Sequence, residues 1–371
     1  ESTSKWETEI NSALNNVKAI VNNTVHLNIP FEEPLYNTIA IDGAYIPKYS
    51  PESRQSLTIT DTEFKFISNK WTKANRILIL CGVLEKSTEL NNLLKQINEN
   101  CSVAILTEST ANLSDLKFIS SIDRTLNSIN EDEVTNYAPD LLISIGGAII
   151  SKRIKSFLRN NKAQEHWQIS LESEPIDTFS SLTKKLDISP LSFFSQIQLL
   201  EPNFESNFGD KWLQKSFLAQ RKHKEFIKQC AWSDLKATSI IIDTLPDFSN
   251  FHMGNSSPVR YTQLFEQIRT VQYNANRGVS GIDGCTSTMI GAASVNNNLT
   301  LLLSGDLSFV YDINALWNNH LTRNIRIIVI NNSGGGIFRI IPGPSSTKQL
   351  EDFFEVGNNV NIQHLVAAHN L

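Results

Sequence analysis

The chain has 371 residues, which is too long for one ordinary hydrophobic core and suits two or three α/β domains. Its formal net charge is −5, and acidic and basic residues are mixed along it, so it has no basic stripe of the kind that binds a phosphate backbone. These properties argue against nucleic acid as a partner.

The cysteines and the apolar runs indicate in which cellular compartment the protein is expected. The four cysteines lie far apart and form no CxxC pair, which favours free thiols in a reducing compartment. No apolar run approaches the roughly 20 residues that a membrane span needs, and the polar start resembles no signal peptide. We therefore expect a cytoplasmic protein without a membrane span.

The first residues predict a helix and a strand. Apolar residues recur at helical spacing from Trp6 to Val21, and residues 24–30 alternate as a strand does. A lone helix and strand cannot form a core, so residues 1–30 are expected to be the tail of an upstream domain, and the chain a piece of a longer polypeptide. Residues 31–59, with their prolines and polar residues, predict an extended linker.

Residues 60–203 predict a first α/β domain. Continuous apolar runs at 76–82, 102–106 and 140–147 indicate buried strands, and residues 90–97 indicate a helix between the first two. This alternation is typical of a parallel sheet covered by helices on both faces. A long charged helix over 204–230 is expected to lead out of the domain.

From Trp232 onward the sequence predicts a second βα series. Short apolar strands alternate in it with amphipathic helices. The strands are expected at 251–254, 270–273, 299–303 and 325–330, and the helices at 234–245, 258–268, 282–295 and 309–317.

Two polar dipeptides end consecutive strands of this second series. Gly305-Asp306 and Asn331-Asn332 are separated by one βαβ crossover, so both strand ends reach the same edge of the sheet. A carboxylate and an amide oxygen suit Mg²⁺ bound to a diphosphate. Gly305 lets the backbone approach phosphates, and Gly334-Gly-Gly336 offers a tight turn and a carbonyl for the metal.

Each dipeptide taken alone is an ordinary turn after a strand. At this spacing, and followed by three glycines, they favour a functional site. The arrangement resembles the GD…NN signature of thiamine-diphosphate enzymes.

Four further stretches narrow the resemblance. They are residues 30–36, 254–260, 276–284 and 331–338, and the most specific run is Arg277-Gly-Val-Ser-Gly-Ile-Asp-Gly284. In order and spacing they resemble the family of 2-succinyl-5-enolpyruvyl-6-hydroxy-3-cyclohexene-1-carboxylate synthases of menaquinone biosynthesis.

The resemblance implies a thiamine-diphosphate-binding fold of three α/β domains. Residues 1–30 would be the tail of the pyrimidine-binding domain, residues 60–203 a central Rossmann-like domain, and residues 204–371 a C-terminally incomplete diphosphate-binding domain. In this family the glutamate that activates the cofactor lies in the N-terminal domain, so the isolated chain is expected to be inactive.

The family's activity sets the expected function. The resemblance implies a transferase that decarboxylates 2-oxoglutarate on thiamine diphosphate and adds the succinyl carbanion equivalent to isochorismate, with Mg²⁺ or Mn²⁺ as the metal. It also implies dicarboxylate substrates, and a homodimer or homotetramer at full length. The alternatives are another thiamine-diphosphate enzyme, either a 2-oxo acid decarboxylase or an acetohydroxyacid synthase, and a non-catalytic scaffold that retains the fold.

Five residues match family positions that face the substrate. Arg260 and Arg277 match arginines that pair with substrate carboxylates, for which the forked guanidinium is suited. Lys152 matches a lysine of the central domain, with an ordinary solvated lysine as a nearly equal alternative. Ile337 and Phe338 match an apolar wall beside the substrate, although phenylalanines are more often core residues.

The remaining matches concern the cofactor. Ile282 corresponds to the apolar residue that wedges between the two cofactor rings, with a core isoleucine as the alternative. Ser256 is either a cofactor contact or a helix N-cap. The other expected cofactor residues are Gly305, Asp306, Leu307, Asn332, Gly334 and Gly335, and of these Asp306, Asn332 and Gly334 are the expected metal ligands.

Overall fold

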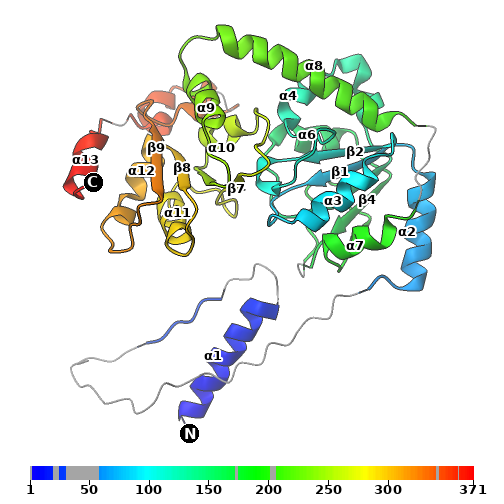
Figure 1. Ribbon diagram of the computed structural model, residues 1–371, viewed down its shortest axis with the longest axis horizontal. Helices are drawn as coiled ribbons and strands as arrows, with labels where there is room; N and C mark the ends of the chain where they lie inside the picture. Colours follow the sequence, from blue (N-terminus) through cyan, green and yellow to red (C-terminus); the bar gives the residue numbers. More distant parts are fainter. Residues whose placement is uncertain are drawn as a thin grey trace.

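Two parallel β-sheets with helices packed around them make up most of the computed structural model (Figure 1). This arrangement confirms the α/β class expected from the sequence. The structure describes residues 2–19, 25–30, 58–171, 174–200, 206–339, 342–357 and 359–371.

The N-terminal prediction was right for the helix and wrong for the strand. Helix α1 spans Ser2–Ala19, but residues 25–30 form no regular element. A strand requires a hydrogen-bonded neighbour, and no described strand pairs with this segment. Most of the predicted linker, residues 31–57, lies outside the described residues.

The first sheet has five parallel strands in the order β2-β1-β3-β4-β5. The first three are the strands predicted from apolar runs. The last two were missed because one carries several polar residues and the other has only three residues. The strands are β1 (Ile77–Cys81), β2 (Val103–Thr107), β3 (Leu141–Ile145), β4 (Glu165–Ile169) and β5 (Lys184–Leu186).

Helices cover both faces of this sheet, because alternate residues of each strand point to opposite sides. In β1, Ile77 and Ile79 join one hydrophobic cluster, while Leu78 and Leu80 join the other. The helices are α2 (Asp61–Lys73), α3 (Thr88–Ile97), α4 (Ile122–Leu126), α5 (Val134–Tyr137), α6 (Lys152–Asn160), α7 (Pro190–Ile197) and α8 (Phe208–Gln229).

Helix α8 begins within the core of the first sheet. Phe208 and Trp212 are buried in one of its hydrophobic clusters, and the amide of Gly209 donates to the carbonyl of Cys101 at 2.7 Å. A Cβ atom at Gly209 would lie 2.1 Å from the backbone oxygen of Val103, so only glycine permits this close approach. The long helix therefore packs on the first sheet before it leads to the second, as Figure 1 shows.

The second sheet has four parallel strands in the order β7-β6-β8-β9. Its strands match the predicted ones to within a few residues. They are β6 (Asn250–Met253), β7 (Gln272–Asn274), β8 (Thr300–Gly305) and β9 (Ile325–Ile330), and the helices are α9 (Asp234–Asp243), α10 (Ser257–Thr262), α11 (Cys285–Ser294), α12 (Asp306–Tyr311) and α13 (Ile362–Ala368).

The order of these strands creates a crevice. From β6 the chain crosses to β7 on one side, and from β8 it crosses to β9 on the other. The connections that follow β6 and β8 therefore diverge at the carboxyl edge of the sheet, which is where open α/β sheets bind ligands.

Side chains from the first half of the chain bind the second half. Asn112 exchanges two hydrogen bonds with the backbone of Tyr273: its Oδ1 accepts from the amide at 2.7 Å, and its Nδ2 donates to the carbonyl at 3.1 Å. Arg124, whose side chain is 8% exposed, forms an ion pair with Glu266 at 2.5 Å. The first contact holds the loop after β2 against β7, and the second holds α4 against the segment that follows α10.

The described helices include none with both the length and the apolar character required to traverse a bilayer.

Candidate active site

A cavity of about 380 Å³ lies at the carboxyl edge of the second sheet. Its walls come from the ends of β8 and β9, from the loops that follow β6 and β9, from the loop before α11, and from α9, α10 and the start of α12. Twelve of the thirteen residues expected from the sequence line this cavity, and these are Ser256, Arg260, Arg277, Ile282, Gly305, Asp306, Leu307, Asn332, Gly334, Gly335, Ile337 and Phe338.

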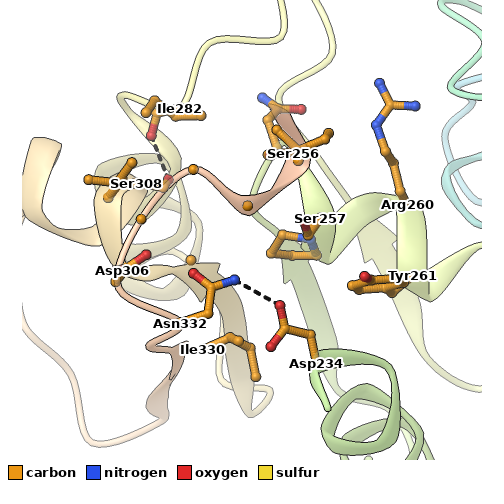
Figure 2. Close-up of a pocket in the computed structure, with 18 of the residues that line it drawn as sticks. Asp234, Ser256, Ser257, Arg260, Tyr261, Ile282, Asp306, Ser308, Ile330 and Asn332 are labelled. Carbon is orange, nitrogen blue, oxygen red and sulfur yellow. Dashed lines mark hydrogen bonds between the residues drawn. The ribbon is translucent and has the colours of Figure 1, made fainter. Parts of the chain in front are cut away.

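The two polar dipeptides lie at the same edge of the sheet. Gly305 is the register partner of Ile330 in the parallel pair β8–β9, so Asp306 and Asn332 follow the ends of neighbouring strands. Asp306 is the first residue of α12 and is 1% exposed. Figure 2 shows the two side chains next to each other, with the amide oxygen of Asn332 on the side of Asp306.

The residues at this edge fit a diphosphate bound through a divalent cation. A Cβ atom at Gly305 would meet no protein atom within 4 Å, so the space beside its backbone belongs to the cavity. Gly334 has φ +149°, a conformation that favours glycine. The described residues contain no group of three His, Cys, Asp or Glu side chains that could hold a metal, so the donors available here are a carboxylate, an amide and carbonyls, which are ligands that suit Mg²⁺.

Three serines around the cavity have positive φ angles. They are Ser256 at 71°, Ser280 at 62° and Ser333 at 66°. Such angles are uncommon for residues other than glycine, and they tend to cluster at functional sites. Ser256 stands at the N-cap position of α10, but its side chain makes no capping hydrogen bond. The N-cap explanation for this residue therefore has no support.

Two arginines bring positive charge to the cavity. A 2.5 Å hydrogen bond runs from Nη1 of Arg277 to Oδ1 of Asn255, while the side chain of Arg260 makes no hydrogen bond or ion pair with any described residue. The Nε of each arginine is buried without a partner in the described part of the chain. Burial and the charge of Arg260 lower the pKa of Arg277. An anion between the arginines would relieve this repulsion and satisfy the unpaired donors.

Asn255 holds the loop that carries Arg277. This asparagine is 1% exposed, and its Nδ2 donates to the carbonyls of Asn276 and Gly281, each at 2.7 Å. Both polar atoms of its side chain therefore bind the loop before α11. The backbone carbonyl of Ile282, in the same loop, accepts a 2.5 Å hydrogen bond from Ser308 at the start of α12.

The apolar wall comes from the segment after the three glycines. Ile337 and Phe338 lie on a short 3₁₀ helix, Gly336–Arg339, and both line the cavity. The ring of Phe338 packs against Phe354 with the centroids 5.6 Å apart. This contact orients one apolar face beside the sheet edge that carries Asp306 and Asn332.

Lys152 is the one expected residue that does not line the cavity. It is exposed at the first turn of α6, in the first half of the chain. Burial lowers the pKa of Lys155, one turn later, while the charge of Glu108 raises it and the charge of Arg277 lowers it.

Glu108 anchors the loop in front of Lys152. It follows β2 and is 1% exposed, and its two carboxyl oxygens accept the amides of Ile150 and Ser151, both at 2.7 Å. Ser151 in turn caps α6 through the amide of Ile154 at 3.0 Å. Burial raises the pKa of Glu108 to about 7, although both amides and the charge of Arg277 oppose the shift.

This pKa predicts a pH-dependent stability difference. Because the folded chain binds the Glu108 proton more tightly than the unfolded chain, the stability from this group is complete below pH 4.5 and is lost as the pH rises to about 7. Relative to the unchanged protein, Glu108→Gln should therefore gain about 3 kcal/mol in unfolding free energy over this range. Urea denaturation at a series of pH values measures the difference, with Glu85→Gln as an exposed control. A difference that stays constant with pH would contradict the prediction.

Sequence reasoning missed Glu108, Asn255 and Asp234. Asp234 begins α9 and lines the cavity, where its Oδ2 accepts a 2.8 Å hydrogen bond from Nδ2 of Asn332. In the sequence, Ser233-Asp234 has only the signature of a helix start. Asn255 and Glu108 are single polar residues after strands, which are common in turns.

Comparisons with known proteins identify the family of this chain. The family described as the middle domain of thiamine pyrophosphate, another name for thiamine diphosphate, matches residues 50–250, which is more than half of the chain.

Several curated relatives carry the same name, 2-succinyl-5-enolpyruvyl-6-hydroxy-3-cyclohexene-1-carboxylate synthase. The chain is 38% identical to the protein of Flavobacterium psychrophilum, over 93% of this chain and 62% of the relative. It is 38% identical to that of Christiangramia forsetii, over 98% and 63%, and 35% identical to that of Porphyromonas gingivalis, over 99% and 65%. The chain thus spans less than two thirds of the length of these relatives.

Proposed function

Because the chain belongs to the thiamine pyrophosphate enzymes that contain this middle domain, we propose that it is the larger part of a 2-succinyl-5-enolpyruvyl-6-hydroxy-3-cyclohexene-1-carboxylate synthase. The whole protein would decarboxylate 2-oxoglutarate and join the remaining succinyl unit to isochorismate, in menaquinone biosynthesis. The names of the relatives and the sequence motifs support this reaction.

One observation supports a class of substrates in addition to the cofactor. Arg260 and Arg277 line one cavity with the apolar residues Ile337 and Phe338, and each arginine has a buried Nε without a partner among the described residues. Two adjacent guanidinium groups suit dicarboxylates, because each can bind a carboxylate through paired hydrogen bonds. A small monoacid needs fewer cations.

The residues for cofactor binding are part of the same proposal. Asp306, Asn332 and the carbonyl of Gly334 would hold Mg²⁺ or Mn²⁺, with Gly305 beside the diphosphate, and Ser256, Leu307, Ile282 and Gly335 would contact the cofactor. When bound, thiamine diphosphate supplies the nucleophilic and electron-accepting carbon chemistry of the reaction. The chain's own contribution is to orient the cofactor, neutralise the substrate carboxylates and exclude water.

The role of the first half is a further part of the proposal. We assign residues 60–203 to the central domain and residues 204–371 to the diphosphate-binding domain. Glu108 supports a contribution from the central domain, because it fixes the loop that leads to Lys152 and its charge acts on Arg277. A homodimer or homotetramer of the full-length protein is proposed from the family alone.

An assay of the full-length protein tests this function. With thiamine diphosphate and Mg²⁺ present, we expect CO₂ release and loss of isochorismate in equal amounts when 2-oxoglutarate is supplied. Release of CO₂ that does not depend on isochorismate would favour a 2-oxo acid decarboxylase, and efficient use of pyruvate would favour an acetohydroxyacid synthase. Cofactor binding without turnover of any of these substrates would favour a non-catalytic scaffold.

A further inference from the structure

Asn332 has a hydrogen-bond partner on the side away from Asp306. Its Nδ2 donates to Oδ2 of Asp234 at 2.8 Å, across 98 residues of sequence. Figure 2 shows Asn332 between the two carboxylates, with its amide nitrogen toward Asp234 and its oxygen toward Asp306. All three residues line the same cavity.

The chemistry of the two groups fixes this orientation. An ionised carboxylate only accepts hydrogen bonds, so the end of the amide that faces Asp234 must be its NH₂ group. The amide oxygen then points the opposite way, toward the edge that carries Asp306. Rotating the amide by half a turn would bring two oxygens together at Asp234 and direct a donor at a cation.

Asp234 is not the N-cap residue of its own helix, α9. Ser233 caps α9, and its side chain accepts from the amide of Lys236 at 3.3 Å. A carboxylate in the first turn is favoured by the helix dipole, but this contribution is small at a partly exposed position. The carboxylate also lies near Tyr261, whose pKa is raised by burial and by the charge of Asp234, so it is directed into the cavity.

We propose that Asp234 is a positioning residue for the metal site: it holds the Asn332 amide so that its oxygen, and not its nitrogen, faces the cation. This inference rests on the proposed function only in requiring that the site binds a divalent cation with thiamine diphosphate. It does not depend on the identity of the substrates.

The test measures metal affinity in the full-length protein. Mn²⁺ is titrated in the presence of thiamine diphosphate, and bound Mn²⁺ is followed by electron paramagnetic resonance. Asp234→Ala should weaken Mn²⁺ binding by about 10- to 100-fold, the usual effect of losing a partner that orients a metal ligand. Asp234→Asn should restore most of the affinity, because its amide oxygen accepts the same hydrogen bond.

Two controls separate positioning from a general structural or charge effect. Asp243→Ala removes the same charge from the exposed end of α9 and should leave Mn²⁺ affinity unchanged. In an Asn332→Ala background, Asp234→Ala should cause no further loss, because there is no amide left to orient.

The outcomes distinguish this inference from the proposed function. Unchanged Mn²⁺ affinity in Asp234→Ala, or an equal loss in the Asn332→Ala background, would overturn the positioning role while the function stands. Failure of the unchanged protein to bind Mn²⁺ with thiamine diphosphate would overturn both. Normal Mn²⁺ results without turnover of 2-oxoglutarate and isochorismate would overturn only the proposed function.

Discussion

Replacing Asp306 with alanine is expected to abolish Mg²⁺-dependent binding of thiamine diphosphate by the full-length protein. Asp306 is 1% exposed at the start of α12, directly after β8, and supplies the one carboxylate among the three proposed metal ligands. Its removal takes away both a ligand and the negative charge that offsets the cation. We expect a loss of more than about 100-fold, beyond the usual effect of an outer-shell partner.

Calorimetry with and without Mg²⁺ measures this effect. Asp306→Asn keeps an oxygen ligand but loses the charge, so its affinity should lie between those of the unchanged protein and the alanine variant. The exposed Asp243→Ala variant controls for loss of charge alone. Mg²⁺-dependent binding that persists in Asp306→Ala would show that the metal role assigned to this residue is wrong.

The second large effect is expected at the arginines. Arg277→Ala or Arg260→Ala should lower kcat/KM for 2-oxoglutarate or isochorismate by about 30- to 700-fold, mainly through KM, because a substrate carboxylate loses its charged partner at a cost of about 2–4 kcal/mol. Steady-state kinetics with each substrate varied in turn would identify which arginine serves which dicarboxylate.

Matched variants make the kinetic result specific. Arg277→Lys keeps the charge but not the forked geometry, so its loss should be smaller than that of alanine. Arg323→Ala removes an exposed arginine from the same half of the chain and should leave the kinetics unchanged. Unchanged KM values for both dicarboxylates in both alanine variants would contradict the proposed substrate class.

Several features of the fold followed from local patterns. The apolar runs that became β1, β2 and β3 are continuous because those strands are buried on both faces. Strands β4 and β5 were not predicted from the sequence, because Glu165, Gln168 and the lysines of β5 interrupt the apolar pattern. The false strand at residues 25–30 shows the opposite error, since alternation alone does not supply a hydrogen-bonded neighbour.

By itself the sequence determined the pairing of β8 with β9 and the common edge of Asp306 and Asn332, because one βαβ crossover leaves little choice of geometry. Only the tertiary structure places β6 beside β8, which brings Ser256 and the helix that carries Arg260 to the same cavity. The hydrogen bond between Asp234 and Asn332 also depends on the tertiary structure. Such contacts depend on strand order and on helix packing between distant segments, and neither leaves a periodic signal in the sequence.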